Sequence, residues 1–381
     1  MESLTPIHDI KFPDGTKTIV LISDIHFGIW NFSTEWVDNI VEYFNSFLLP
    51  RLKDMKDKVL VIAGDFFDNR QVLDIGIMNA AMNVVTSLSK ECPVYLLVGN
   101  HDIYKRNGTE INSLRIFEKM PGVVIIDAPT IVRGNEKSFL MLPWIGDNVK
   151  ETRYLKENEA RYDCAILHSE ISGFRFDNNI RIIDGVDLTS INGKKLIFSG
   201  HIHKRQTSGN VCYIGSAFQL RRVDSGNDRG MYIINADTLE NLFVKNDFSP
   251  KYMRFELRDL LQFNMSQLRP LVKNNYLDVT IKQEDVNILD VARLSDVLKE
   301  CGARKMELTV DDMNEEISSS IEKVRPIEDI MNIPKLVKES IDGLLGVSPE
   351  DKKQIMDMND KYFSIAVADS MKNTDTESQQ Q

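Results

Sequence analysis

Five of the six histidines in this chain stand directly after a short apolar run, in segments that also contain Asp, Asn or Gly. Carboxylate, imidazole and amide groups are the mixed ligands that suit Mn²⁺, Fe²⁺ or Zn²⁺, whereas Ca²⁺ prefers oxygen ligands alone. The pattern therefore predicts a metal site assembled from distant parts of the chain. The segments are Ser23-Asp24-Ile25-His26, Gly64-Asp65-Phe66-Phe67-Asp68, Gly99-Asn100-His101-Asp102, Leu167-His168-Ser169 and Gly200-His201-Ile202-His203.

The spacing within these segments favours shared metal ions. Residues two apart in an extended segment point the same way, so Asp24 and His26 can hold one ion together. His201 and His203 can do the same across a pair of ions. Each segment alone is more often a structural turn, and only the set of five in this order argues for a site. The sixth histidine, His8, has no such context, and we interpret it as a surface or core residue.

The elements that must position these residues are short strands in residues 1–245. Apolar runs alternate with turns and with helix-like stretches such as Thr34–Phe47 and Asp74–Lys90. This alternation predicts a layered α/β domain, in which ligands gather at the carboxyl ends of strands. The predicted strands are Thr18–Ser23, Val59–Ala63, Val94–Val98, Cys164–Leu167, Leu196–Ser199, Val211–Ile214 and Gly230–Ile234.

The character of the chain changes after about residue 245. Residues 246–312 are expected to form a small α/β capping domain, with strand, helix and strand at Tyr276–Ile281, Val291–Glu300 and Lys305–Val310. A polar linker follows at 313–325. Residues 326–371 predict a pair of amphipathic helices, the second opening at Ser348-Pro349-Glu350, where Ser suits the N-cap and Pro the first turn. The tail at 372–381 is polar and predicted to be disordered.

Composition sets limits on the function. The 381 residues have a net charge of −11, but residues 247–381 alone hold 26 acidic and 18 basic side chains. Several acids of the front part are candidate metal ligands, and bound cations change the local field, so an anionic substrate is not excluded. No apolar run reaches the roughly 18 residues of a membrane span, and no secretion signal opens the chain. The four scattered cysteines predict buried thiols in a reducing cytosol.

The motif order resembles that of the calcineurin-like metallophosphoesterases over residues 18 to about 235. Within that superfamily the chain is most similar to the SbcD-type double-strand-break repair nucleases, in particular the recombination endonuclease subunits of T-even-like phages. The similarity lies in Asp102, where protein phosphatases have Glu, and in a second segment without their Arg-Gly extension. Ile103 departs from the acidic residue usual at its position. Further shared segments are Leu142-Pro143-Trp144, Tyr213-Ile214-Gly215-Ser216 and Asp228-Arg229-Gly230.

The resemblance implies a layered sandwich of two mixed β-sheets flanked by helices, with two metal ions, expected to be Mn²⁺, at one edge. It implies that His101 is the general acid and that Asp68 orients it. A histidine with a pKa near 6.5 can supply the proton that a leaving sugar oxygen needs. The implied ligand sets are Asp24, His26, Asp65 and His203 for one ion and Asp65, Asn100, His168 and His201 for the other, bridged by Asp65.

The resemblance also implies partners: DNA, an SbcC-type coiled-coil ATPase held by the C-terminal helix pair, and a second copy of the chain paired through helices near residues 74–90. The expected location is the cytoplasm, that of the host if the chain is phage-encoded. Lys204-Arg205 and Arg221-Arg222 are candidates for DNA backbone contacts, although a solvated charged face is the simpler interpretation of any single pair, Lys194-Lys195 included.

Three functions stay open at this point. The leading hypothesis is a Mn²⁺-dependent DNA endo- and exonuclease subunit of an SbcCD-like complex. The second is a small-molecule phosphodiesterase of the cyclic-nucleotide type, which shares the five motifs but rarely needs some 135 further residues ending in amphipathic helices. The third is an inactive scaffold that has kept the fold, against which the intact ligand set argues.

Overall fold

The computed structural model of this chain describes residues 4–104, 108–189, 191, 193–282 and 291–311, together with 350, 352, 353 and 356. By its internal contacts the chain divides into one unit at Met1–Asp311 and a second at Asp312–Gln381. The predicted linker at 313–325, the tail at 372–381 and nearly all of the predicted helix pair at 326–371 lie outside the described residues. Within the helix pair, Glu350, Lys352, Lys353 and Met356 are helical.

The first sheet has six strands in the order β13-β12-β2-β3-β4-β5. The strands from β2 to β5 run parallel, and β12 is antiparallel to both β2 and β13. The continuous Val, Ile and Leu runs of β2, β3 and β4 are buried on both faces, as parallel strands covered on two sides require. The bounds are β2 (Thr18–Ile22), β3 (Lys58–Ala63), β4 (Val94–Leu97), β5 (Val123–Ile126), β12 (Gly230–Asn235) and β13 (Asn241–Lys245).

The second sheet has seven strands in the order β1-β6-β7-β8-β9-β11-β10. It is also mixed, because β6 and β7 are antiparallel, as are β10 and β11, while β7, β8, β9 and β11 run parallel. The bounds are β1 (His8–Lys11), β6 (Thr130–Arg133), β7 (Ser138–Leu142), β8 (Cys164–His168), β9 (Leu196–Gly200), β10 (Gln206–Ser208) and β11 (Val211–Tyr213).

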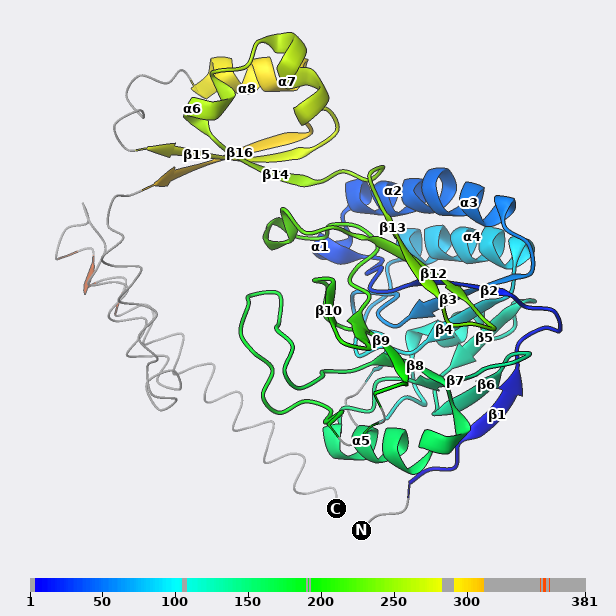
Figure 1. Cartoon of the computed structure of the whole chain (residues 1–381). Helices are drawn as coiled ribbons and strands as arrows, with labels where there is room; N and C mark the ends of the chain where they lie inside the picture. Colours follow the sequence, from blue (N-terminus) through cyan, green and yellow to red (C-terminus); the bar gives the residue numbers. More distant parts are fainter. Residues whose placement is uncertain are drawn as a thin grey trace, which may run out of the picture. The chain divides into compact units, whose positions relative to one another are not determined.

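Helices cover the outer face of each sheet, and Figure 1 shows α2, α3 and α4 over the first sheet and α5 beside the second. Three buried cores separate these layers: one between the helices and the first sheet, one between the sheets, and one between the second sheet and α5. This arrangement confirms the predicted sandwich of two mixed sheets flanked by helices. The bounds are α1 (Ile29–Phe32), α2 (Thr34–Glu42), a π-helix (Tyr43–Leu48), α3 (Leu49–Asp54), α4 (Ile75–Glu91) and α5 (Asn148–Glu157).

Four single 3-10 turns complete this part of the chain, at Ser113–Phe117, Glu159–Arg161 and Arg222–Asp224, with the first following the third motif and the last preceding β12. Asp74 caps α4, since its carboxylate accepts bonds from the N–H groups of Gly76 at 2.8 Å and Ile77 at 3.1 Å. Among the residues described, no helix has both the length and the apolar character that crossing a bilayer requires.

A third sheet of parallel strands, β14-β15-β16, follows the sandwich and has an apolar core of its own. It contacts α2, because the Tyr276 hydroxyl donates a bond to Glu35 at 2.6 Å and the Tyr276 ring stacks on Trp36 at 5.8 Å between centroids. These strands fall inside the predicted 246–312 range. The bounds are β14 (Tyr252–Glu256), α6 (Leu257–Leu260), α7 (Met265–Val272), β15 (Tyr276–Lys282), α8 (Val291–Glu300) and β16 (Lys305–Asp311).

Candidate metal centre

All five motif segments lie at the carboxyl ends of strands, on β2, β3 and β4 of the first sheet and β8 and β9 of the second. Backbone bonds join the first two segments: the N–H of Asp24 donates to the Gly64 carbonyl at 3.1 Å, and that of His26 to the Asp65 carbonyl at 3.0 Å. Between the sheets, the N–H of His201 donates to Oδ1 of Asp24 at 3.1 Å. The structure therefore brings the segments together at one edge of the sandwich.

The backbone of this edge is strained at the functional residues. The φ angle is 55° at Asp24, 54° at His26, 52° at Asp65 and 81° at His201, in the left-handed region that costs a non-glycine residue about 1–3 kcal/mol. Gly64 also has a positive φ, of 92°, and a Cβ there would overlap the His168 imidazole. Strain concentrated on these side chains indicates that their aim, and not local preference, fixes the backbone.

Each of the four candidate ligand imidazoles has one nitrogen directed to the cluster and the other near an oxygen atom. These oxygens can only accept when ionised or carbonyl, so they assign the proton to the outer nitrogen and leave a lone pair on the inner one. The outer contacts are His26 Nδ1 with Asp68 at 3.0 Å, His168 Nδ1 with the Ala63 carbonyl at 2.8 Å, His201 Nε2 with Glu170 at 3.2 Å and His203 Nδ1 with Asp177 at 3.6 Å.

Four acceptor atoms converge in one half of the cluster. Nε2 of His168 lies 3.0 Å from Oδ1 of Asn100 and 3.2 Å from Oδ2 of Asp65. Nδ1 of His201 lies 2.7 Å from the same Asn100 oxygen. With lone pairs facing one another, these atoms need a shared cation, which is the role proposed for the second ligand set.

The other half of the cluster has the same character. Nε2 of His26 lies 3.0 Å from Nε2 of His203, and 3.8 Å from Oδ2 of Asp65. Asp24 lies with both histidines in a group whose potential ligand atoms are within 4.8 Å of one another. Its Oδ2 is buried and has no hydrogen-bond partner among the described residues. Asp65 thus lies within reach of both halves, at the position of a bridging ligand.

The charges of the site also favour an added cation. Burial by itself lowers the pKa of His168, but the negative charge of Asp65 raises that pKa to about 9. Burial opposes ionisation of Asp65, yet His168 keeps the pKa of this carboxyl well below its usual range. A proton on the imidazole thus balances the carboxylate where a metal ion would do so. The residues therefore fit the divalent ions predicted from the sequence.

His101 lies beside the cluster with a different set of contacts. Its Nδ1 donates to the backbone carbonyl of Asp68 at 2.6 Å, which leaves Nε2 for proton exchange, and its ring lies 4.9 Å from that of His26. The carboxylate of Asp68 is directed instead to Nδ1 of His26. Asp68 thus contacts both imidazoles, His101 through its carbonyl and His26 through its side chain.

Three acidic residues of the site did not stand out as functional in the sequence. Glu170 and Asp177 follow β8 without any motif spacing, and only the fold places them beside His201 and His203. Asp102, noted in the sequence only as a family feature, accepts bonds from the N–H groups of Phe66, Phe67 and Gly99 at 3.3, 3.0 and 2.9 Å. Its carboxylate therefore ties the second segment to the third, and burial raises its pKa to about 7.

The basic pairs are partly engaged in contacts within the chain. The Arg205 guanidinium lies 4.3 Å from the centroid of the Phe243 ring, and Arg222 pairs with Asp278 at 3.4 Å and with Glu307. Lys204 donates to the side chain of Asn179 at 2.7 Å and is the more exposed of the motif-adjacent pair. These contacts give the arginines structural roles whatever else they bind.

Comparison with known proteins gives a family for this architecture. Residues 17–205 match the model of the calcineurin-like phosphoesterases. Exonuclease subunit 1 of Enterobacteria phage T4 is 28% identical over 188 residues, which are 48% of this chain and 55% of that protein. A protein named as a phosphoesterase, 078R of Invertebrate iridescent virus 3, is 29% identical over 220 residues, 54% of this chain and 59% of its own.

A further relative named as a phosphoesterase, 244L of Invertebrate iridescent virus 6, is 27% identical over 229 residues, 57% of this chain and 75% of that protein. The chain spans little more than half the length of the first two relatives. All seven candidate ligands lie within the matched range, which ends just after His203. Through residues 17–205 this chain belongs to the calcineurin-like phosphoesterase family, and it is a metal-dependent phosphoesterase.

Proposed function

We propose that this chain is the nuclease subunit of a DNA recombination and repair complex of the SbcCD kind, with Mn²⁺ as its metal. The observation that carries the proposal is the set of acceptor atoms converging from both sheets, with His101 beside it and bonded to a carbonyl instead of a cluster atom. The name of the phage relative, an exonuclease subunit, supports DNA as the substrate.

The chain's own residues have separable tasks in this reaction. When bound, two divalent ions would polarise the phosphodiester and lower the pKa of the attacking water. The Asp68 carbonyl holds His101 by Nδ1, so that Nε2 can pass a proton to the leaving sugar oxygen. Asp102 fixes the two loops that carry Asp65 and His101 relative to each other. These loops therefore keep acid and ligands in register.

Hydrolysis assays on purified full-length chain test the proposal. Linear and hairpin DNA, each labelled at one end, and 2′,3′- and 3′,5′-cyclic nucleotides are incubated with Mn²⁺, with Mg²⁺ or with EDTA. We expect Mn²⁺-dependent cleavage of DNA that Asp65→Ala abolishes and that the exposed control Asp187→Ala leaves in place. Cleavage of cyclic nucleotides alone would favour the small-molecule phosphodiesterase. Inactivity on all substrates with every metal would favour the scaffold.

The proposal extends to partners. An SbcC-type ATPase would bind through residues 326–371, and a second copy of the chain would pair through the region of α4. Val72 and Ile75 at the start of α4 are 54% and 70% exposed, which supports an apolar contact there. The complex would act on DNA in the cytoplasm, that of the host if the chain is phage-encoded.

A further inference from the structure

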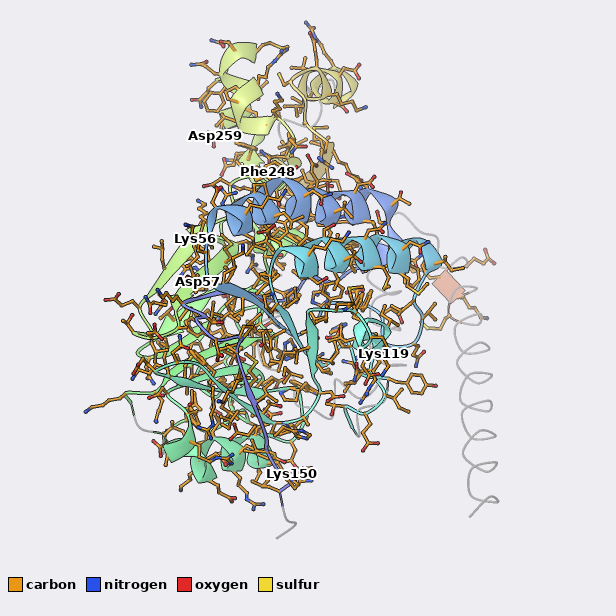
Figure 2. The ribbon with its side chains drawn as sticks, turned by 90° about the vertical axis from the view of Figure 1, so that its right-hand side faces the viewer. Lys56, Asp57, Lys119, Lys150, Phe248 and Asp259 are labelled. Atoms are coloured by element: carbon orange, nitrogen blue, oxygen red, sulfur yellow. The ribbon has the colours of Figure 1, made fainter. Side chains whose placement is uncertain are left out.

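A hollow of about 900 Å³ opens beside the metal centre, between the loop after the third motif and the segment that follows β7. Its wall is largely apolar and aromatic, with Ile103, Tyr104, Ile111, Trp144 and Tyr154 among the lining side chains. Lys150 on α5 marks the lower end of this region in Figure 2, near the amino-terminal strand. The volume is at the upper end of the range for ligand pockets, about 300–1,000 Å³.

The hollow is continuous with the metal centre through two side chains. The Trp144 ring lies 4.8 Å from the ring of His201, and its backbone N–H donates to the Val98 carbonyl at 2.9 Å, just before the third motif. Ile103 stands two residues after His101 and is 1% exposed. A group bound in the hollow would therefore be attached to whatever occupies the metal centre by a short linkage.

The charges that line the hollow indicate what it can accept. Glu110, Asp127 and Asp147 contribute three carboxylates. The two described cations are already paired, Arg115 with Asp127 at 2.6 Å and Lys150 with Asp147 at 3.8 Å. A phosphate would meet more negative than positive charge here. A flat, uncharged heterocycle suits the aromatic wall, and its amino groups can donate to the carboxylates.

We propose that the hollow receives one unstacked nucleobase of the strand being cleaved, from a nucleotide beside the scissile phosphate. This inference rests on the proposed nuclease function and adds the form of its substrate. A base in an intact duplex is stacked and paired, and extruding it costs a few kcal/mol. Single strands, frayed ends and hairpin loops are therefore the substrates that can fill the hollow without this cost.

The test compares oligonucleotides that differ at single positions. One abasic site is moved stepwise along a single-stranded substrate, and kcat/KM is divided by that for bis(4-nitrophenyl) phosphate, which has no base. Stacking of one base contributes about 1–3 kcal/mol, or roughly 5- to 150-fold. We expect a loss in this range at one position next to the cleaved bond, and full activity with the abasic site elsewhere.

Variants link that position to the hollow. Ile111→Glu adds a charge at a site that is 70% exposed, and Ile183→Glu is the matched control at an 80% exposed site outside the hollow. Ile111→Glu and Tyr104→Ala should lower the normalised activity on single strands by at least about fivefold and remove the sensitivity to the abasic site. Ile183→Glu should behave as the unsubstituted chain.

The outcomes separate this inference from the proposed function. If DNA is cleaved but the abasic scan is flat, or if Ile111→Glu matches Ile183→Glu, the hollow does not bind a base. A hollow filled by a protein partner would show as a change in ATPase binding by Ile111→Glu with no change on free DNA, and would also overturn the inference. If the chromogenic diester is cleaved and DNA is not, the nuclease proposal fails, and the base-binding inference with it.

Discussion

The Nε2 atoms of His26 and His203 lie 3.0 Å apart, although the two residues are separated by 177 positions in the chain. Hydrogen bonds and ion-pair contacts hold their outer nitrogens toward Asp68 and Asp177, so the inner nitrogens present lone pairs to each other. Such an approach is favourable only with a cation between them or beside them. The first prediction concerns the number of cations.

Metal analysis after loading with Mn²⁺ and desalting should give about two equivalents per chain. Asp65→Ala should lose both ions, because Asp65 lies 3.2 Å from His168 in one half of the cluster and 3.8 Å from His26 in the other. Asp187→Ala, exposed and remote from the cluster, is the control. Two retained equivalents in Asp65→Ala would show that this residue does not bridge.

Replacement of His101 should separate chemistry from metal binding. His101→Ala should reduce the hydrolysis rate by about 10²–10⁴-fold, the usual contribution of a general acid, while metal content stays near that of the unsubstituted chain. The reason is that Nδ1 of His101 donates to a backbone carbonyl and not to a cluster atom. The exposed His8→Ala is the control. Metal loss in His101→Ala would instead make His101 a ligand.

The two acids found only in the structure should tune metal affinity. Glu170→Ala and Asp177→Ala each remove the oxygen beside the outer nitrogen of a ligand histidine, at 3.2 Å for His201 and 3.6 Å for His203. Loss of such a partner typically weakens metal binding by about 10- to 100-fold. Calorimetric titration with Mn²⁺ measures this directly. An affinity equal to that of Asp187→Ala, together with an unchanged Tm of the metal-free chain, would deny these acids the role.

Glu151 should make stability depend on pH. It is fully buried, its Oε1 accepts bonds from the N–H groups of Ile145 and Gly146 at 3.1 Å, and burial raises its pKa to about 7. Between the ordinary carboxyl pKa and pH 7 the folded chain keeps a proton that the unfolded chain releases. The free energy of unfolding therefore falls as pH rises through this window, by about 3 kcal/mol, and stays lower above it.

Glu151→Gln keeps the carbonyl acceptor and has no proton to lose, so it should remove this dependence. Relative to the unsubstituted chain, it should be more stable at pH 8 than at pH 5, as measured by urea unfolding in EDTA. Glu136→Gln, at an exposed turn, supplies the control. Parallel stability curves for the Glu151→Gln and unsubstituted chains would mean that Glu151 is ionised in the folded state.

Deletion of residues 320–381 should separate catalysis from partner binding. The deleted segment lies within the second unit, which begins at Asp312, and contains none of the seven candidate ligands. The truncated chain should bind metal and keep basal hydrolysis, but it should no longer co-purify with the ATPase or respond to ATP. Co-purification and stimulation equal to those of the full chain would place the docking element elsewhere.

Sequence patterns were sufficient for the buried strands and insufficient for the exposed ones. Each of the seven predicted strands appears in the structure within one or two residues, because runs such as that of Val59–Ala63 are apolar on both faces. β13 was not predicted, since its half-exposed residues Asn241–Lys245 resemble a loop, and β10 has only three residues. The helix predicted at Thr34–Phe47 continues to Asp54 through a π-helical turn that no residue pattern signals.

The same contrast applies to the site. The motif residues could be found because each follows a strand, and strand ends in an α/β fold share an edge. Glu170 and Asp177 could not, since their positions depend on the path of the loop after β8 and not on local spacing. Asp68 shows a further limit: the sequence places it near His101, but only coordinates distinguish its carbonyl from its carboxylate as the contact.

The metal centre draws its ligands from two sheets, and this has a consequence for how the chain acquires activity. Asp24 and His201 meet across 177 residues of sequence, so closing that loop costs conformational entropy before any contact between them can form. Neither sheet alone carries a full set of ligands. A nascent chain synthesised only as far as β4 holds Asp24, Asp65 and Asn100 without their imidazole partners from β8 and β9. Hydrolytic capacity therefore arises late, once translation has passed His203 and the two sheets have packed.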